Sequence, residues 1–226
     1  MTERARTRDI GVVDAPHTFS QLGVLVLDGS GSMENPAVGK LTKAEAVNNA
    51  VREMLTRFSV SRHKRNFSFA VVTFDDEAAV HTPLTPATEI DDNADYDPLR
   101  NHGGGTSIAT GLAEARRIAD EFLATAPADI PSSAVIVVMS DGRDGEGGVG
   151  DPAHTLRLAD EIKANPAVTL CTTYFGIPGE GDTVAQDHLR ALASNPATGF
   201  KTVYDAETLR KFFIASVSAG HNMAIA

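Results

Sequence analysis

Short apolar runs alternate with longer segments in which apolar residues recur at helical spacing. Four of the runs are rich in β-branched, leucine and phenylalanine residues and are bounded by Gly, Pro, Asp or Asn, which predicts buried strands. They lie at residues 22–27, 67–74, 134–139 and 168–175. Two further short strands are expected at residues 78–84 and 201–204.

The intervening segments predict helices at residues 40–58, 107–123, 151–164 and 183–193 and after residue 205. Asp151 followed by Pro152 is typical of a helix start, because proline suits the first helical position. Thr183 and Gln186 have the spacing of a capping box, and Asp205 is expected to cap the last helix.

Strands that alternate with helices over short links predict a mostly parallel sheet with helices on both faces. The expected fold class is α/β: a three-layer, doubly wound, Rossmann-like sheet with a short antiparallel edge strand at residues 78–84. A chain of 226 residues fits one such domain. We place this domain at residues 20–220, between an N-terminal arm at 1–19 and a C-terminal tail at 221–226.

Polar side chains follow two of the predicted buried strands. Asp28, Ser30 and Ser32 alternate with glycine after the first strand, and Asp141 follows the strand at 134–139. Thr106 comes after three glycines, directly before a predicted helix. Ligand groups gather outside the carboxyl ends of parallel strands, so these side chains are expected to meet there. Their carboxylate and hydroxyl oxygens suit a hard divalent cation such as Mg²⁺.

Each of these residues also has a purely structural explanation. A serine beside glycine is typical of turns, and Asp28, Thr106 or Asp141 could each cap a helix. Only their joint occurrence favours a metal site.

Three separated motifs together resemble the von Willebrand factor A-type (vWA) domain: Asp-x-Ser-x-Ser from Asp28, Gly-Gly-Thr ending at Thr106, and Ser-Asp-Gly around Asp141. The resemblance runs over about residues 20–218, nearly the whole chain. It implies a metal-ion-dependent adhesion site formed by Asp28, Ser30, Ser32, Thr106 and Asp141. In that family the two serines, and sometimes the threonine, contact Mg²⁺ directly, while the two aspartates act largely through bound water. Mn²⁺ and Ca²⁺ are alternative ions.

The resemblance also implies a binding module and not an enzyme. Hydroxyl ligands are neutral, so the cation keeps much of its charge toward an open position, where an Asp or Glu of a protein partner completes the octahedron. Intracellular bacterial relatives act with AAA-type ATPases, or in stress-response and conflict-system operons beside kinases and phosphatases. We therefore expect a stand-alone bacterial protein of the cytoplasm, and the sequence does not select among these partners.

Composition narrows the class of partner. The formal net charge is −10, and no basic cluster follows the first residues, which argues against nucleic acid as a ligand. The basic residues at 62–65 are interpreted as a solvated turn. No apolar stretch has the length of a membrane span or a signal peptide, so no membrane partner is expected. The single cysteine, Cys171, lies in a predicted strand and is interpreted as a core residue.

Other polar residues are weaker candidates. Arg143, Asp76 and His102 are placed at the rim of the site as possible partner contacts. The remaining loop acids nearby are interpreted as surface residues, namely Asp75, Glu77, Asp144 and Glu146. His102 and His154 are otherwise expected to be ordinary surface histidines, and Asn48 and Asn49 to face solvent.

Enzymatic alternatives fit less well. A phosphoaspartyl hydrolase usually places a second aspartate two residues after its nucleophile, and here that position is Ser30. Gly39-Lys40 lacks the first glycine and the terminal hydroxyl of a P-loop, and neither serine has the glycines of a nucleophile elbow. An Mg²⁺-dependent phosphohydrolase remains an open alternative, because Mg²⁺ on paired carboxylates can polarise a phosphoryl oxygen.

Overall fold

The computed structural model describes residues 14–219, and its centre is a six-stranded sheet in the order β3-β2-β1-β4-β5-β6. The strands are β1 (Ser20–Asp28), β2 (Phe67–Phe74), β3 (Ala78–Pro86), β4 (Ser132–Ser140), β5 (Val168–Phe175) and β6 (Phe200–Val203). Only the pair β2–β3 is antiparallel; all other neighbours in the sheet run parallel. The predicted fold class is confirmed, including the antiparallel edge strand.

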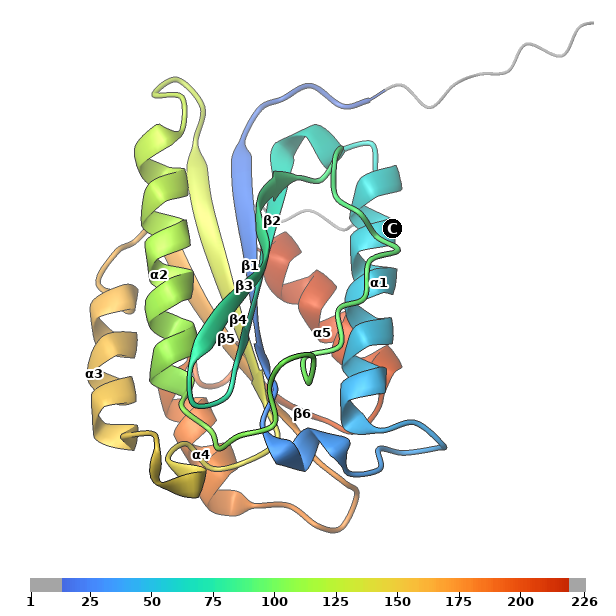
Figure 1. Ribbon diagram of the computed structural model, residues 1–226. Coiled ribbons are helices and arrows are strands. Elements are labelled where there is room, and N and C mark those ends of the chain that lie inside the picture. Colours follow the sequence, from blue (N-terminus) through green and yellow to red (C-terminus); the bar gives the residue numbers. More distant parts are fainter. Residues whose placement is uncertain (1–13, 220–226) are drawn as a thin grey trace, which may run out of the picture.

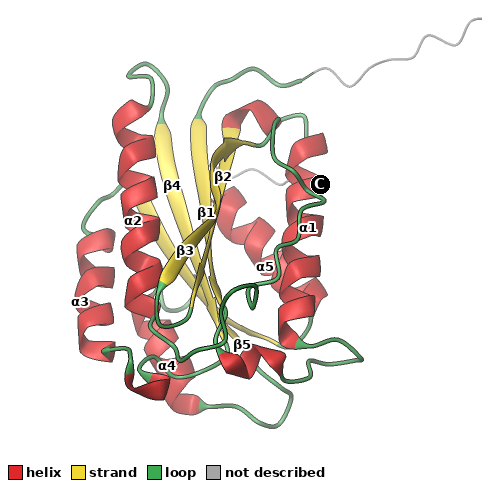
Figure 2. Ribbon diagram, viewed as in Figure 1, coloured by secondary structure: helices red, strands yellow, loops and turns green. Residues whose placement is uncertain are grey.

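Helices cover both faces of the sheet (Figures 1 and 2). They are α1 (Lys43–Val60), α2 (Ile108–Thr125), α3 (Pro152–Lys163), α4 (Thr183–Leu192) and α5 (Ala206–Ser218). Helices α1 and α5 pack on one face, whereas α2, α3 and α4 pack on the other. Within residues 14–219, no helix combines the length and apolar character that a bilayer crossing requires.

Alternate residues of the central strand β1 supply two separate cores. Leu25 and Leu27 belong to the core beneath α1 and α5, while Val24 and Val26 belong to the core beneath α2. All four side chains are fully buried. Burial on both faces explains why this strand is a continuous apolar run and not an alternating one.

The chain reverses its winding direction at β1. From β1 it crosses to β2 on one side of the sheet, and it later returns to β4 on the other side. The loops that follow β1 and β4 therefore diverge at the carboxyl edge of the sheet, which is where open parallel sheets bind ligands. Asp28 ends β1, and Asp141 comes directly after β4.

Helix starts follow local capping chemistry. Thr42 and Glu45 form a reciprocal capping box at the start of α1, which begins three residues later than predicted. Asp151 and Asp205 cap α3 and α5 as expected. The capping box predicted from Thr183 is wrong, because Asp182 caps α4 by accepting hydrogen bonds from two backbone N–H groups. A carboxylate one residue earlier competes better for these donors than a threonine hydroxyl.

The long connection between β3 and α2 is tied down against α1. The Asn48 side chain donates to Oδ1 of Asp95 at 3.1 Å and accepts from the Tyr96 backbone N–H at 3.0 Å. Tyr96 is almost fully buried, and its hydroxyl donates to the Asp91 carbonyl at 2.6 Å. The expectation that Asn48 faces solvent is therefore wrong; its amide fixes this connection in place.

Candidate metal centre

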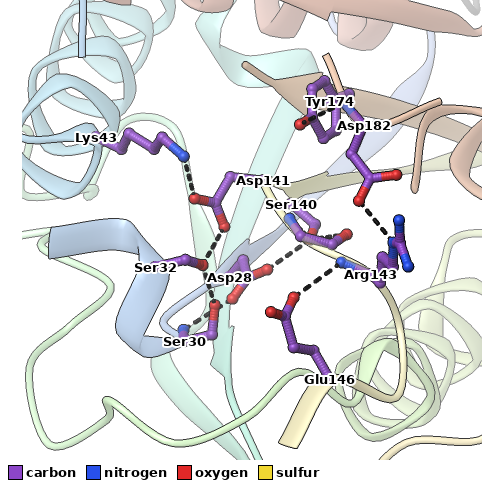
Figure 3. A network of polar contacts seen from close by, with 11 residues as sticks. Asp28, Ser30, Ser32, Lys43, Ser140, Asp141, Arg143, Glu146, Tyr174 and Asp182 are labelled. Atoms are coloured by element: carbon purple, nitrogen blue, oxygen red, sulfur yellow. Dashed lines mark hydrogen bonds and ion pairs between the residues drawn. The ribbon is translucent and has the colours of Figure 1, made fainter. Parts of the chain in front are cut away.

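Four of the five predicted metal ligands come together at the carboxyl edge of the sheet, namely Asp28, Ser30, Ser32 and Asp141 (Figure 3). Ser30 Oγ lies 3.1 Å from Ser32 Oγ, and Ser32 Oγ donates to Oδ1 of Asp141 at 2.7 Å. Oδ1 of Asp28 accepts a hydrogen bond from the Ser30 backbone N–H at 2.8 Å. Four of the five side chains thus form one connected polar cluster.

Thr106 joins this cluster from the start of α2. A Cβ atom built on Gly142 would lie 3.8 Å from Thr106 Oγ1 and 3.9 Å from Ser32 Oγ. The threonine hydroxyl therefore lies on the same side of the Gly142 backbone as the serine hydroxyl. Its backbone N–H donates to the Glu146 carbonyl at 3.0 Å, which joins the loop before α2 to the loop after β4.

The loop that carries the two serines is anchored in the core. Residues Gly31–Glu34 form a 3₁₀ turn whose Met33 side chain is fully buried in the core beneath α1. Gly29 lies so close to the loop before α2 that a Cβ there would be 2.2 Å from the Pro98 carbonyl oxygen. Real Cβ atoms do not approach this closely, so the close contact requires glycine at position 29.

Two acidic side chains hold the glycine loop that precedes Thr106. One carboxylate oxygen of Asp75 accepts from the N–H groups of Gly103 and Gly104, each at 3.1 Å. Asp76 accepts from the N–H of Gly105 at 2.6 Å. Both therefore act on the position of Thr106, and Asp76 is also exposed.

His102 is not a surface residue, and this prediction is wrong. Its side chain is only 6% exposed and lies between Asp75 Oδ1, 2.9 Å from Nδ1, and Thr73 Oγ1, 2.9 Å from Nε2. Burial alone would raise the pKa of Asp75, but hydrogen bonds from His102 and from backbone N–H groups outweigh it and lower that pKa. His102 therefore supports the glycine loop from inside and does not lie on the partner rim.

Asp144 is also buried, contrary to its interpretation as a surface acid. Its Oδ1 accepts from the Ile108 backbone N–H at 3.0 Å, and its Oδ2 lies 3.2 Å from His188 Nε2. It thereby supplies the cap at the start of α2 that Ser107 does not provide.

Asp28 is the most perturbed acid of the cluster. Burial raises its pKa to about 7, and the nearby charge of Asp141 adds to this rise. Hydrogen bonds from Ser140 and Ser30 oppose the shift, and the Ser140 hydroxyl lies 2.5 Å from Oδ2. The protonated and charged forms of Asp28 are therefore nearly balanced at neutral pH when no cation is bound.

Sequence reasoning missed Lys43, which enters the cluster from the first turn of α1 (Figure 3). Its Nζ lies 2.5 Å from Oδ2 of Asp141, and both side chains are buried. The available signal was the Thr42–Glu45 capping box, which fixes the helix start and places the lysine directly inside it.

Comparison with known proteins assigns the family. The sequence model of the von Willebrand factor type A domain matches residues 24–214. The chain belongs to this vWA family. No curated protein matches it in sequence.

Solved structures share the vWA fold at low sequence identity. A von Willebrand factor type A protein from Catenulispora acidiphila is 24% identical with a TM-score of 0.62, over 88% of this chain and 43% of that one. The pilus adhesin SpaC from Lactobacillus rhamnosus GG is 14% identical with a TM-score of 0.66, over 89% and 30%. The vWF domain of the type V pili tip protein Mfa5 from Porphyromonas gingivalis is 15% identical with a TM-score of 0.64, over 92% and 98%.

These likenesses establish the fold of this vWA domain. The chain spans 43% of the Catenulispora protein and 30% of SpaC, so it matches one part of those longer chains. The vWA fold is often used for protein–protein interaction, as the pilus adhesins illustrate.

The residues of the cluster fit a hard divalent cation. All the candidate donors are oxygens, and neighbouring ligands of octahedral Mg²⁺ lie about 3 Å apart, close to the separations seen here. Within residues 14–219, no group of three or more His, Cys, Asp or Glu side chains could hold a metal. The candidate site consists of two carboxylates and three hydroxyls, and such oxygen donors suit Mg²⁺ better than zinc.

Arg143 lies on the loop after β4, two residues beyond Asp141. Its guanidinium is exposed and pairs with Asp182 at 2.6 Å, which holds the loop after β4 against the start of α4. The hydrogen bond that Arg143 donates to Asp182 also raises the pKa of Arg143, so this side chain is cationic at any physiological pH.

Proposed function

We propose that this vWA domain is a non-catalytic module that binds a carboxylate of a protein partner through Mg²⁺. The observation that carries the proposal is the convergence of Asp28, Ser30, Ser32, Thr106 and Asp141 at the switch point of the sheet. Ser30, Ser32 and Thr106 would hold the ion directly, and Asp28 and Asp141 largely through water. Mn²⁺ or Ca²⁺ could replace Mg²⁺ on the same oxygens.

The composition of the cluster favours binding over catalysis. When bound, Mg²⁺ supplies a strong positive charge for an anionic ligand. The residue two positions after Asp28 is a serine, Ser30, and the nearby histidines His102 and His188 are engaged with Asp75 and Asp144. The two histidines nearest the cluster are therefore not free to move a proton for a bound substrate.

Exposed apolar side chains lie on the loops after β1 and β4, which carry candidate ligands, and would contact the partner. Val38 and Leu41, on the loop after β1, are 51% and 37% exposed, and Val149, on the loop after β4, is 42% exposed. Such side chains favour a protein surface in which an Asp or Glu is surrounded by apolar residues. The general negative charge of the chain repels acidic surfaces, so recognition would depend on the ion.

Within this proposal the protein acts in the bacterial cytoplasm. Its partner would be an AAA-type ATPase, or a kinase or phosphatase encoded beside it in a stress-response or conflict-system operon. Neither nucleic acid nor a membrane is part of the proposed function.

Melting of the protein with Mg²⁺ and with EDTA tests the site. A cation that binds only the folded state raises the melting temperature, so Mg²⁺ should stabilise the wild type and not Asp28→Ala. Asp129→Ala is the matched control, because Asp129 is exposed in the loop before β4 at the other end of the sheet. An equal shift in the wild type and Asp28→Ala would remove the site assignment.

Partner capture tests the function. Proteins retained from the host by the immobilised domain should be released by EDTA, restored by Mg²⁺ and lost with Asp141→Ala. Partners that stay bound in EDTA and bind Asp141→Ala as well as the wild type would show that recognition does not use the ion.

A further inference from the structure

Lys43 occupies a position that disfavours a cation on two grounds. It is the first residue of α1, where the positive end of the helix dipole opposes a positive charge. It is also buried, with the side chain only 8% exposed, and burial of an ammonium group is costly unless an anion compensates it. A lysine in this position therefore depends on its partner.

That partner is one of the candidate metal ligands. Oδ2 of Asp141 lies 2.5 Å from Lys43 Nζ, while Oδ1 of the same carboxylate accepts the Ser32 hydroxyl at 2.7 Å. Figure 3 shows Lys43 and Ser32 approaching Asp141 from different directions. The carboxylate is thus shared between the hydroxyl cluster and the ammonium group.

Lys43 is also the buried cation of the cluster. Among the described residues the buried charged side chains are Asp28, Lys43, Asp141 and Asp144. Asp144 is occupied by the start of α2 and by His188, so it does not face the hydroxyls. Arg143 and Glu146 lie nearby but are exposed, where water and salt screen their charges.

We propose that Lys43 is a resident counter-cation of the metal site, which lowers the affinity of the empty site for divalent ions. This inference rests on the proposed function. The two negative charges of Asp28 and Asp141 alone would balance the charge of a divalent ion. With the ammonium group of Lys43 present, the metal-bound site carries one surplus positive charge. The carboxylate of a partner removes that surplus, so the lysine makes metal binding and partner binding depend on each other.

Removal of the lysine charge tests the inference on the intact protein. Lys43→Met keeps most of the side-chain volume, and Lys43→Gln keeps a hydrogen-bond donor for Asp141 without its charge. Lys40→Met is the matched control, because it removes the same charge from an exposed position of the same loop. Calorimetric titration with MgCl₂ and MnCl₂ gives the dissociation constant, and melting in EDTA reports folding of the metal-free protein.

Both Lys43 variants should bind Mg²⁺ and Mn²⁺ about tenfold more tightly than the wild type, as the loss of one nearby charge implies. They should also melt at lower temperature in EDTA, since Asp141 then lacks its counter-charge. Lys40→Met should match the wild type in both respects. A lysine that merely holds Asp141 in place for the ion would give the opposite change in affinity.

Acetate serves as the probe for the link to the partner. At equal ionic strength, sodium acetate in place of sodium chloride should strengthen Mn²⁺ binding by the wild type more than by Lys43→Met. Equal effects in the two proteins would overturn the proposed link.

Unchanged or weaker metal binding by both Lys43 variants would overturn the counter-cation role and leave the proposed function intact. Absence of metal binding in the wild type would overturn the proposed function itself. If neither variant folds even with saturating MgCl₂, the lysine is a structural core residue and the inference is wrong.

Discussion

Ser140 donates its hydroxyl hydrogen to Oδ2 of Asp28 across 2.5 Å, and so joins the ends of β4 and β1 inside the protein. The other oxygen of Asp28 accepts the Ser30 backbone N–H at 2.8 Å. These two hydrogen bonds fix the carboxylate at the switch point of the sheet. They also favour its charged form against the effect of burial.

Ser140→Ala should weaken Mg²⁺ binding in a pH-dependent manner. Without this donor the pKa of Asp28 rises from its value of about 7. A larger fraction of the Asp28 side chains is then protonated at neutral pH. We expect affinity to fall about tenfold at pH 7 and to recover largely by about pH 9, because the carboxylate is then charged again.

Calorimetric titration at the two pH values checks this prediction. Ser133→Ala is the control, since Ser133 lies on the same strand and its hydroxyl has no hydrogen-bond partner among the described residues. The same loss at both pH values would contradict a role through the charge of Asp28.

The stability of the metal-free protein should fall as pH rises toward 7. The folded-state pKa of Asp28, about 7, exceeds the ordinary aspartate value of 3.8, so the folded state binds this proton more tightly than the unfolded state. The contribution of Asp28 to the free energy of unfolding is fully present below pH 3.8 and is lost as pH rises through about 7.

Asp28→Asn removes the titrating group and should raise the free energy of unfolding at pH 8 in EDTA, on the order of 2–4 kcal/mol. At pH 5 the gain should be much smaller. Thermal melts of both proteins from pH 5 to 9 give the difference, and parallel curves would contradict the raised pKa.

His102→Ala should lower both stability and metal affinity although His102 touches none of the candidate ligands directly. Its loss removes the contacts with Asp75 and Thr73 and loosens the glycine loop that carries Thr106. We expect a loss of about 1–3 kcal/mol in the free energy of unfolding. His154→Ala, at an exposed position of α3, should stay within about 0.5 kcal/mol of the wild type.

Urea unfolding and metal titration of the two histidine variants supply the comparison. If His102→Ala behaves as His154→Ala does, the Asp75–His102–Thr73 contacts do not support the site.

Helices and strands with a clear hydrophobic periodicity could be predicted from the sequence, because this local pattern alone is sufficient to identify them. The bounds of β2 and β5 agree with the predicted strands, as each is a run rich in β-branched and aromatic residues. The residue that caps a helix was harder to predict where two neighbouring side chains could both accept hydrogen bonds from the first backbone N–H groups. For α4 the carboxylate of Asp182 prevailed over Thr183, which the pattern alone did not distinguish.

Long-range contacts of single polar residues could not be predicted. His102 and Asn48 follow no apolar period, and their burial depends on Asp75 and on Asp95, which the fold brings near. The Lys43–Asp141 pair joins residues 98 positions apart; the Thr42–Glu45 capping box fixes where α1 begins, but it does not indicate that Lys43 contacts Asp141. By contrast, Asp28 is the last residue of β1 and Asp141 directly follows β4, so the parallel topology alone places them together.

No hydrolytic turnover is expected. The cluster offers oxygens for a cation, while His102 and His188 are held by carboxylates. Assays of phosphomonoesters, phosphodiesters, nucleotides and esters with Mg²⁺ and Mn²⁺ should therefore give background rates. Activity above background that disappears in Asp28→Ala would instead favour a metal-dependent phosphohydrolase.

The two outer strands restrict how this domain can associate with other chains. Strand β3 carries Pro83 and Pro86 and pairs with β2 through two register shifts, and β6 is only four residues long. Prolines, irregular pairing and short length all hinder the addition of a foreign strand to a sheet edge. Growth into strand-paired polymers is thereby disfavoured, so strand addition at either edge is not expected to be the way in which this domain binds another protein.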